Sequence, residues 1–239
     1  MKKLRRNVLN NYVNGIKDGI PIGLAYLSVS FTFGLAAKEG GLSIFTSVLI
    51  SLLNLTSAGQ FAGLDIIKAG GSLIEIAVTT LIINMRYLLM SFALSQRVDE
   101  KIPTLKRMIL SFGITDEIFA VICQKEEKVG ARYFLGLMTL PVICWSMGTF
   151  IGAGASMLLP GMLRSALSIA IYGMFISIII PPAKKHKPYF VAILIAVALS
   201  CFFKYTPYVN NLSGGWVIII SSLTASLLCA YFLPIKFKE

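Results

Sequence analysis

Two pairs of polar or charged residues lie inside apolar segments of this chain, and their side chains indicate ligand binding. Asn84 and Arg86 lie in the apolar run 72–95, and Asp116 and Glu117 adjoin each other in a weaker apolar run. Charged side chains at membrane depth are costly, and they mark substrate sites or ion pathways. A guanidinium group binds a carboxylate through two parallel hydrogen bonds. The residue types therefore predict a site for a small carboxylate ligand, with the two acids coupling its movement to an ion.

A third group of small and polar residues interrupts the apolar run 42–67 near its middle. Its members are Asn54, Thr56, Ser57, Gly59 and Gln60. Irregular backbone at membrane depth is tolerated only where protein buries it or where it lines a cavity. Exposed half-helix ends offer N–H groups to an anionic ligand group and C=O groups to an ammonium. We expect a broken second span that forms one wall of a zwitterion site, with ordinary small-residue helix packing as the alternative.

Structural roles are also open for the charged residues. In the alternative reading, Arg86 forms an ion pair with Glu75 or Asp116, or donates hydrogen bonds to free carbonyl groups at the end of the broken helix. Asp116 and Glu117 have a solvated alternative if the segment 108–123 lies at the membrane interface. If that segment crosses as a helix, adjacent positions point about 100° apart. One acid would then face Arg86 while the other meets water.

Composition places the chain in a membrane. It is 56% hydrophobic and only 14% charged over 239 residues, with a mean hydropathy of +0.78. Apolar windows of 18 or more residues recur, which is typical of membrane spans. The net charge of +11 comes mainly from basic residues at the ends and between apolar runs, so nucleic acid is not an expected partner. Without metal-ligand or catalytic spacings in the spans, we expect neither a cofactor nor enzymatic activity.

The apolar pattern predicts an all-α, polytopic transmembrane helix bundle. Seven strong segments and one weak segment are expected, at 19–37, 42–67, 72–95, 133–155, 163–181, 189–206 and 214–234, with the weak one at 108–123. Residues 1–18 are expected to form an amphipathic segment on the inner surface. Residues 19–239 then form a single transmembrane domain.

A faint internal repeat is visible within that domain. A shift of 114 residues lays Ala58–Phe61 onto Tyr172–Phe175 and Gly34 onto Gly148. This match predicts repeat halves at 19–95 and 133–206, a linker at 96–132 and a final span at 214–234. The halves are parallel if 108–123 crosses and inverted if it does not.

The positive-inside rule ranks the topologies. With the N-terminus inside and all eight segments crossing, most basic residues lie on the inner side, including Lys125, Lys128 and Arg132. If 108–123 does not cross, every later loop changes side and the outer side carries the excess. We therefore expect eight crossings with both termini cytoplasmic, although the cluster from Arg97 to Arg107 then lies outside.

Five short motifs together resemble the AzlC family of branched-chain amino acid exporters. They are Gly19–Gly23, Phe33–Ala36, Ser57–Phe61, Ile83–Tyr87 and Thr115–Glu117. The match is densest over residues 15–125 and continues more weakly to about residue 235. The resemblance implies functional positions at Ser57, Gly59, Gln60, Asn84, Arg86, Asp116 and Glu117. The second candidate repeat half departs from the first, with Met174 where the first has Gln60.

The resemblance also implies a function. It predicts a secondary transporter of the bacterial cytoplasmic membrane that exports valine, leucine, isoleucine or analogues. It implies a partner, a small AzlD-type membrane subunit. A proton or ion gradient is the expected driving force because the chain lacks a nucleotide-binding signature. Export of another small metabolite, an integral-membrane enzyme and a scaffold for a partner are the alternatives.

Overall fold

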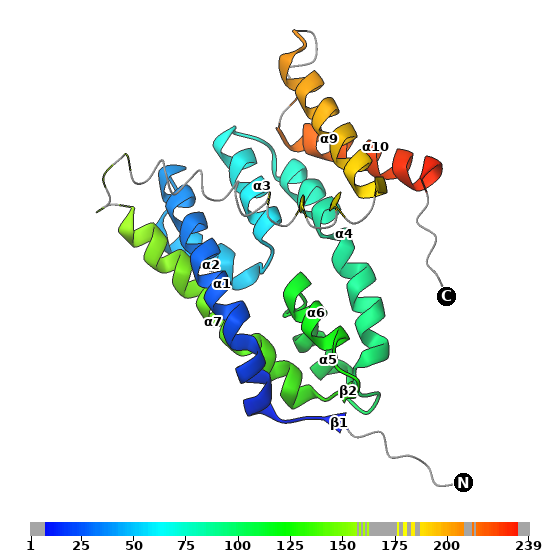
Figure 1. Ribbon diagram of the computed structural model, residues 1–239. Coiled ribbons are helices and arrows are strands. Elements are labelled where there is room, and N and C mark those ends of the chain that lie inside the picture. Colours follow the sequence, from blue (N-terminus) through cyan, green and yellow to red (C-terminus); the bar gives the residue numbers. More distant parts are fainter. Residues whose placement is uncertain are drawn as a thin grey trace. The chain divides into compact units, whose positions relative to one another are not determined.

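The computed structural model describes residues 8–156, 187–207 and 214–233, together with isolated positions between residues 158 and 212. The described part is helical apart from one pair of two-residue strands (Figure 1). The elements are β1 (Val8–Leu9), α1 (Tyr12–Glu39), α2 (Ile44–Leu53), α3 (Ser57–Lys68), α4 (Leu73–Arg97), α5 (Thr104–Ser111), α6 (Asp116–Cys123), β2 (Lys128–Val129), α7 (Ala131–Ala155), α9 (Lys187–Tyr205) and α10 (Gly214–Phe232).

Five of the described helices, namely α1, α4, α7, α9 and α10, are long and apolar enough to cross a membrane. They confirm the helices expected at five of the strong segments. The break predicted within 42–67 is also present, because α2 and α3 are separated by non-helical residues 54–56. The segment 163–181 and the repeat match at 172–175 lie outside the described residues. The predicted count of seven strong spans and one weak span is therefore not reproduced among the described helices.

The chain forms two compact units. The first contains Met1–Gln60 and Asn84–Arg164, and the second contains Phe61–Ile83 and Ser165–Glu239. In the second unit α9 packs against α10, where Ser200 Oγ lies 3.3 Å from Ser221 Oγ. Also in that unit, the Glu75 carboxylate accepts a hydrogen bond of 3.1 Å from the backbone N–H of Gly215. That bond satisfies a free donor at the start of α10.

Helices α1 and α7 pack against each other along their whole length, and both run in the same direction. A Cβ built on Gly15 would lie 2.2 Å from the carbonyl oxygen of Tyr133, and one on Gly34 would lie 2.2 Å from that of Thr149. Rising residue numbers in one helix therefore match rising numbers in the other. Small residues allow such close approach in membranes, where van der Waals packing replaces the hydrophobic effect between helices. The contact fixes α1 and α7 as a parallel pair.

The expected surface helix before residue 19 is not a separate element over its described part. The α1 helix begins at Tyr12, where the Asn11 side chain accepts hydrogen bonds from the backbone N–H groups of Val13 and Asn14. An asparagine in this position satisfies free donors of the first turn. The first two turns of α1 already pack on α7 through Gly15, so residues 12–18 are continuous with the long helix.

Three chain segments meet at the end of the first unit where α1 and α7 begin. Strand β1 pairs in parallel with β2 directly before the two helices. The backbone N–H of Asp99, just after α4, donates to the carbonyl of Val129 at 2.9 Å. The last turn of α4 therefore ends beside the first turns of α1 and α7.

From this end, α5 and α6 form a hairpin that enters the first unit and returns. Leu110 on α5 packs in the buried cluster with Phe134 of α7. At the tip, Gly113 approaches Met138 so closely that a Cβ would lie 2.7 Å from the methionine sulfur. After α6, the Lys125 ammonium pairs with Asp18 at 2.7 Å, near the start of α1. Both legs of the hairpin therefore open toward the same end.

The expectation that 108–123 crosses as one span is corrected by this path. The segment is two short helices separated by a turn at residues 112–115, and neither is long enough to span a bilayer. Ile118 and Ile122 of α6 are buried in the same cluster as Leu137 of α7. Their packing on the α1–α7 pair turns the chain back.

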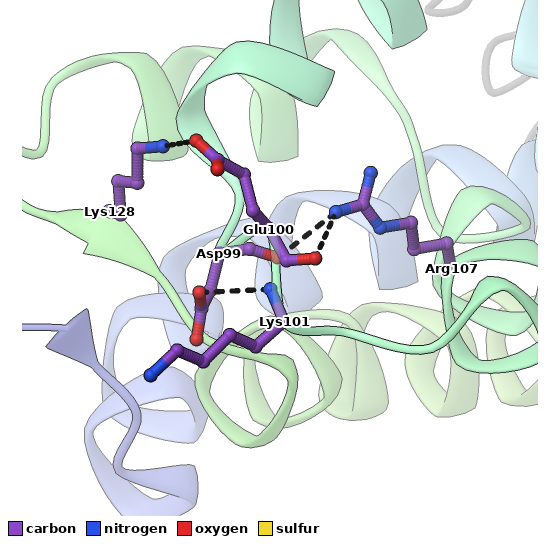
Figure 2. A network of polar contacts seen from close by, with 5 residues as sticks. All are labelled: Asp99, Glu100, Lys101, Arg107 and Lys128. Carbon is purple, nitrogen blue, oxygen red and sulfur yellow. Dashed lines mark hydrogen bonds and ion pairs between the residues drawn. The ribbon is translucent and has the colours of Figure 1, made fainter.

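Polar contacts fix the base of the hairpin (Figure 2). Arg107 donates from Nε to the carbonyl of Ile102 at 3.1 Å and from Nη2 to the carbonyls of Asp99 and Glu100 at 3.2 and 3.1 Å. Lys128 forms an ion pair with the Glu100 carboxylate. The Lys128 ammonium donates a hydrogen bond to this carboxylate, and the bond and the positive charge together lower the pKa of Glu100. The pair therefore persists until the pH falls below the usual range of a glutamate. The turn between α4 and α5 is thereby tied to β2.

The α1–α7 contact predicts opposite effects for two glycines that lie close together on α7. In Gly152→Ala the new Cβ would lie 2.0 Å from the backbone oxygen of Phe31, whereas nothing lies within 4 Å of a Cβ on Gly154. We expect Gly152→Ala to lower the free energy of unfolding by about 1–3 kcal/mol. Gly154→Ala should leave it unchanged or slightly higher, because alanine is the better helix former. Thermal unfolding of the detergent-solubilised variants measures both, and equal effects would contradict the packing.

The hairpin makes a prediction about labelling in whole cells. Lys106 and Glu127 are exposed before and after the hairpin, and Glu39 is exposed at the far end of α1. In a background without the four native cysteines, Lys106→Cys and Glu127→Cys should react with an impermeant maleimide from the same side of the membrane. Glu39→Cys should react from the opposite side. Labelling of positions 106 and 127 from opposite sides would show that the segment crosses.

Candidate functional site

The break between α2 and α3 is held by side chains that sequence analysis assigned to ligand binding. Asn54 ends α2 in extended conformation, and its carbonyl accepts a hydrogen bond of 2.5 Å from Gln60 Nε2. The same amide nitrogen lies 3.2 Å from the carbonyl of Ile50. Gln60 therefore satisfies the Asn54 carbonyl at the end of α2, as buried backbone at membrane depth requires, and adds a second donor to the Ile50 carbonyl, which already accepts from the Asn54 N–H. Ser57 is the first residue of α3.

Thr56 connects the break to α4. Its hydroxyl donates to Asn84 Oδ1 at 2.7 Å and accepts from the backbone N–H of Gly59 at 3.4 Å. A Cβ on Gly59 would lie 2.8 Å from the Thr56 side chain, so a larger residue would displace this contact. Thr56 and Gln60 are both buried. Asn54, Thr56, Gly59, Gln60 and Asn84 thus form one polar cluster, called the break cluster below.

Within the described residues, the Oε1 atom of Gln60 is buried and has no hydrogen-bond partner. A buried acceptor without a donor is costly, and such groups are rare in folded proteins. The other half of the same amide is fully used by the carbonyls of α2. The break cluster therefore has a structural role in joining the half-helices and retains one acceptor for a further donor.

A second cluster lies at the tip of the hairpin. Arg86 Nη1 lies 2.8 Å from Asp116 Oδ2, so the arginine pairs with the acid that sequence analysis named among its alternative partners. The Arg86 guanidinium also lies over the ring of Tyr87, with Cζ 5.1 Å from the centroid. The two side chains of the ion pair are 42% and 47% exposed. Both charges therefore remain reachable by a ligand in this conformation.

On the sequence alone one of the two acids is expected to meet water, but Glu117 has a protein partner. Its Oε2 atom accepts a hydrogen bond of 2.5 Å from the hydroxyl of Tyr26 on α1. The Tyr26 ring contacts Trp145 of α7 edge-on, with ring centroids 5.2 Å apart. Both aromatic residues are buried. The tip of the hairpin is thus attached to α1 through Glu117 and to α4 through Asp116.

Tyr26 and Trp145 are site residues that sequence reasoning missed. A tyrosine in the middle of a span carries a hydroxyl that needs a partner, and this was the available signal for Tyr26. For Trp145 there was no comparable signal in the local sequence. Its indole N–H is buried and has no hydrogen-bond partner among the described residues. The aromatic pair therefore places a hydroxyl on Glu117 and keeps an open indole donor in the packing behind it.

The structure gathers most of the predicted residues into two clusters that meet α4, and no hydrogen bond or ion pair joins Asn84 directly to Arg86. Asn84 belongs to the break cluster and Arg86 to the ion pair. Two residues apart on a helix, their side chains leave the axis about 200° apart. The single wall expected from Asn54 to Arg86 is therefore two neighbouring polar regions on one helix.

The long apolar helices, with an ion pair on one of them, define a polytopic membrane protein. The family model described as AzlC protein matches residues 21–159, more than half of the chain. That stretch includes both polar clusters. The chain belongs to the AzlC family.

Curated relatives agree with this membership. The chain is 29% identical over 221 residues to the inner membrane protein YgaZ of Escherichia coli (strain K12), covering 90% of this chain and 89% of that protein. It is 33% identical over 172 residues to an uncharacterized membrane protein of Archaeoglobus fulgidus, covering 71% and 75% respectively. An uncharacterized membrane protein of Helicobacter pylori (strain J99) is 25% identical over 152 residues, covering 61% and 66%. No solved structure matches the chain.

Proposed function

We propose that this protein is a secondary transporter that exports branched-chain amino acids across the bacterial cytoplasmic membrane. A small AzlD-type membrane subunit is its proposed partner, and a proton or ion gradient is the proposed driving force. Membership of a family of membrane proteins is consistent with transport. The observation that supports the amino acid as cargo is the ion pair between Arg86 and Asp116.

The pair is complementary to a zwitterion. An α-amino acid carries a carboxylate and an ammonium on one carbon, and Arg86 and Asp116 present the two opposite charges 2.8 Å apart. A bound amino acid would separate the pair, with its carboxylate on Arg86 and its ammonium on Asp116. Without ligand the two side chains neutralise each other, which keeps uncompensated charge out of the membrane interior. The site is therefore stable in both the empty and the loaded state.

Competition at Asp116 supplies the coupling. A protonated Asp116 is neutral and cannot hold an ammonium group, so the site carries either a proton or the amino acid. A carrier with mutually exclusive cargoes exchanges one for the other, and a proton moving inward then drives the amino acid outward. Glu117, hydrogen-bonded to Tyr26, is the second candidate for the coupling acid.

The break cluster has a supporting part in this proposal. Asn84 is two residues from Arg86, and the break joins α4 through Thr56. Half-helix ends at a break supply N–H groups to a carboxylate and C=O groups to an ammonium. Asn54, Ser57 and Gly59 are proposed to contribute such backbone groups, and Gln60 its free Oε1. A change in the conformation of the break would thus move the Thr56–Asn84 contact on α4.

Charge distribution supports an inner position for the end where α1 and α7 begin. Basic residues near that end are Arg97, Lys101, Lys106, Arg107, Lys125, Lys128 and Arg132. The positive-inside rule places such a cluster in the cytoplasm. With α4 counted as one crossing, the segment of α2 and α3 then begins and ends outside. The cluster from Arg97 to Arg107, which contradicted the rule under eight crossings, agrees with it under this topology.

An efflux measurement tests the function and the role of the ion pair together. Cells loaded with labelled valine should lose it faster when the chain is expressed with its small subunit. Arg86→Ala should reduce efflux to the rate of cells without the chain, because the carboxylate loses its partner. The double charge swap Arg86→Asp with Asp116→Arg should restore the ion pair and still fail to transport.

The matched control for the swap is the Lys128–Glu100 pair at the hairpin base in Figure 2. Lys128→Glu with Glu100→Lys exchanges two charges away from the site and should leave efflux unchanged. Full transport by the Arg86–Asp116 swap would assign that pair a purely structural role. An unchanged efflux of every aliphatic amino acid on expression of the wild type would refute the exporter.

Asp116→Asn tests the coupling. The amide keeps the size of the carboxyl group but cannot take up a proton, so valine movement in vesicles should no longer respond to an imposed pH gradient. Asp99→Asn, in the turn at the hairpin base, is the matched control and should respond as the wild type does. If Asp116→Asn retains the full response while Glu117→Gln loses it, Glu117 is the coupling acid.

A further inference from the structure

An apolar cavity lies in the first unit between α4, the first leg of the hairpin and the start of α7. Its volume is about 140 Å³, and its walls include Leu94, Val98, Leu110, Ile114 and Phe134. Leu94, Val98, Leu110 and Phe134 are buried. An apolar cavity of about 150 Å³ in another protein stays dry and binds benzene, so this volume suits a small hydrocarbon group.

Three of the four polar side chains at the cavity wall are engaged in hydrogen bonds. Arg107 is the charged residue of the lining, and its guanidinium donates to backbone carbonyls of the preceding turn. The hydroxyls of Ser95 and Ser111 donate to carbonyls of their own helices, at 2.6 and 2.7 Å. The cavity therefore presents carbon surface and offers no free charge to a ligand. This arrangement favours an apolar group.

The cavity approaches the Arg86–Asp116 pair along the hairpin. On the hairpin, Ile114 precedes Asp116 by two residues. On α4, Ser91 follows Arg86 by five residues, a rise of about 7.5 Å, and the two side chains leave the helix about 140° apart. Through the hairpin wall, a ligand whose ammonium binds Asp116 would have the cavity within reach of a short hydrocarbon chain.

The same face of α4 links the break cluster to the cavity. Asn84, Ser91, Leu94 and Val98 recur at helical spacing and share that face. At Asn84 this face contacts Thr56, and from Ser91 to Val98 it lines the cavity. The break cluster thus lies on the face of α4 that continues into the cavity wall.

We infer that this cavity is the side-chain subsite for the aliphatic side chain of an amino acid whose charged groups bind Arg86 and Asp116. The inference rests on the proposed function and adds the residues that select the cargo. Four-carbon side chains fill the cavity, the methyl group of alanine leaves it largely empty, and the benzyl group of phenylalanine, one carbon larger than benzene, exceeds it and meets Leu110 and Phe134. The hairpin supplies one wall, so its position sets the size of the accepted side chain.

Filling the cavity tests the subsite. Ser91→Leu places an isobutyl group in the cavity, and Ser28→Leu makes the same change at an exposed position on α1. Efflux of labelled leucine and alanine is measured in parallel, with each variant's membrane level as a reference. We expect Ser91→Leu to lower the leucine-to-alanine efflux ratio about tenfold or more, since one methylene in an apolar pocket changes selectivity by this order. Ser28→Leu should keep the wild-type ratio.

A second variant keeps the test decisive if Ser91→Leu fails to accumulate in the membrane. Ile114→Val removes one methylene from the wall and should shift the phenylalanine-to-leucine efflux ratio upward severalfold. Unchanged ratios in these variants, with wild-type export intact, would overturn the subsite and leave the proposed function standing. A wild type that exports no aliphatic amino acid would overturn both.

Discussion

The parallel contact of α1 with α7 is the constraint on which the rest of the first unit depends. Glycines along both helices bring the two backbones together from Gly15 to Gly34, and the pair has one direction. Because the pair is parallel, the strands that precede the two helices lie side by side. The end of α4 joins them there through Asp99. The chain between α4 and α7 must therefore leave and return at one end, which makes α5 and α6 a hairpin.

The hairpin places two acids on a short helix inside the protein. Asp116 and Glu117 occupy the first turn of α6, where the positive end of the helix dipole favours negative charge. Arg86 of α4 pairs with Asp116, and Tyr26 of α1 donates a hydrogen bond to Glu117. A polar connection across three helices results, and on the hairpin it begins two residues after Ile114 of the cavity wall. Charge and hydrocarbon surface are thus arranged in the order in which an aliphatic amino acid carries them.

Sequence alone predicted the break in the second segment, because the alternative, small-residue helix packing, explains Asn54 and Gln60 less well. It also offered the pairing of Arg86 with Asp116 as one alternative. The hairpin could not be predicted from the sequence, because residues 112–115 contain only a glycine and a threonine as turn signals in an apolar segment. The direction of that segment depends on packing against α1 and α7. Hydropathy counts single segments and contains no information on such contacts.

The position of the hairpin in the chain has a consequence for biosynthesis. During translation α5 and α6 emerge before α7, yet Ile118 and Ile122 are buried in a cluster that includes Tyr133 and Leu137 of α7. Neither short helix can be retained as a span by the insertion machinery. The hairpin must therefore wait near the membrane surface until α7 has inserted beside α1. The ion pair and the cavity are consequently among the last features of the first unit to assemble.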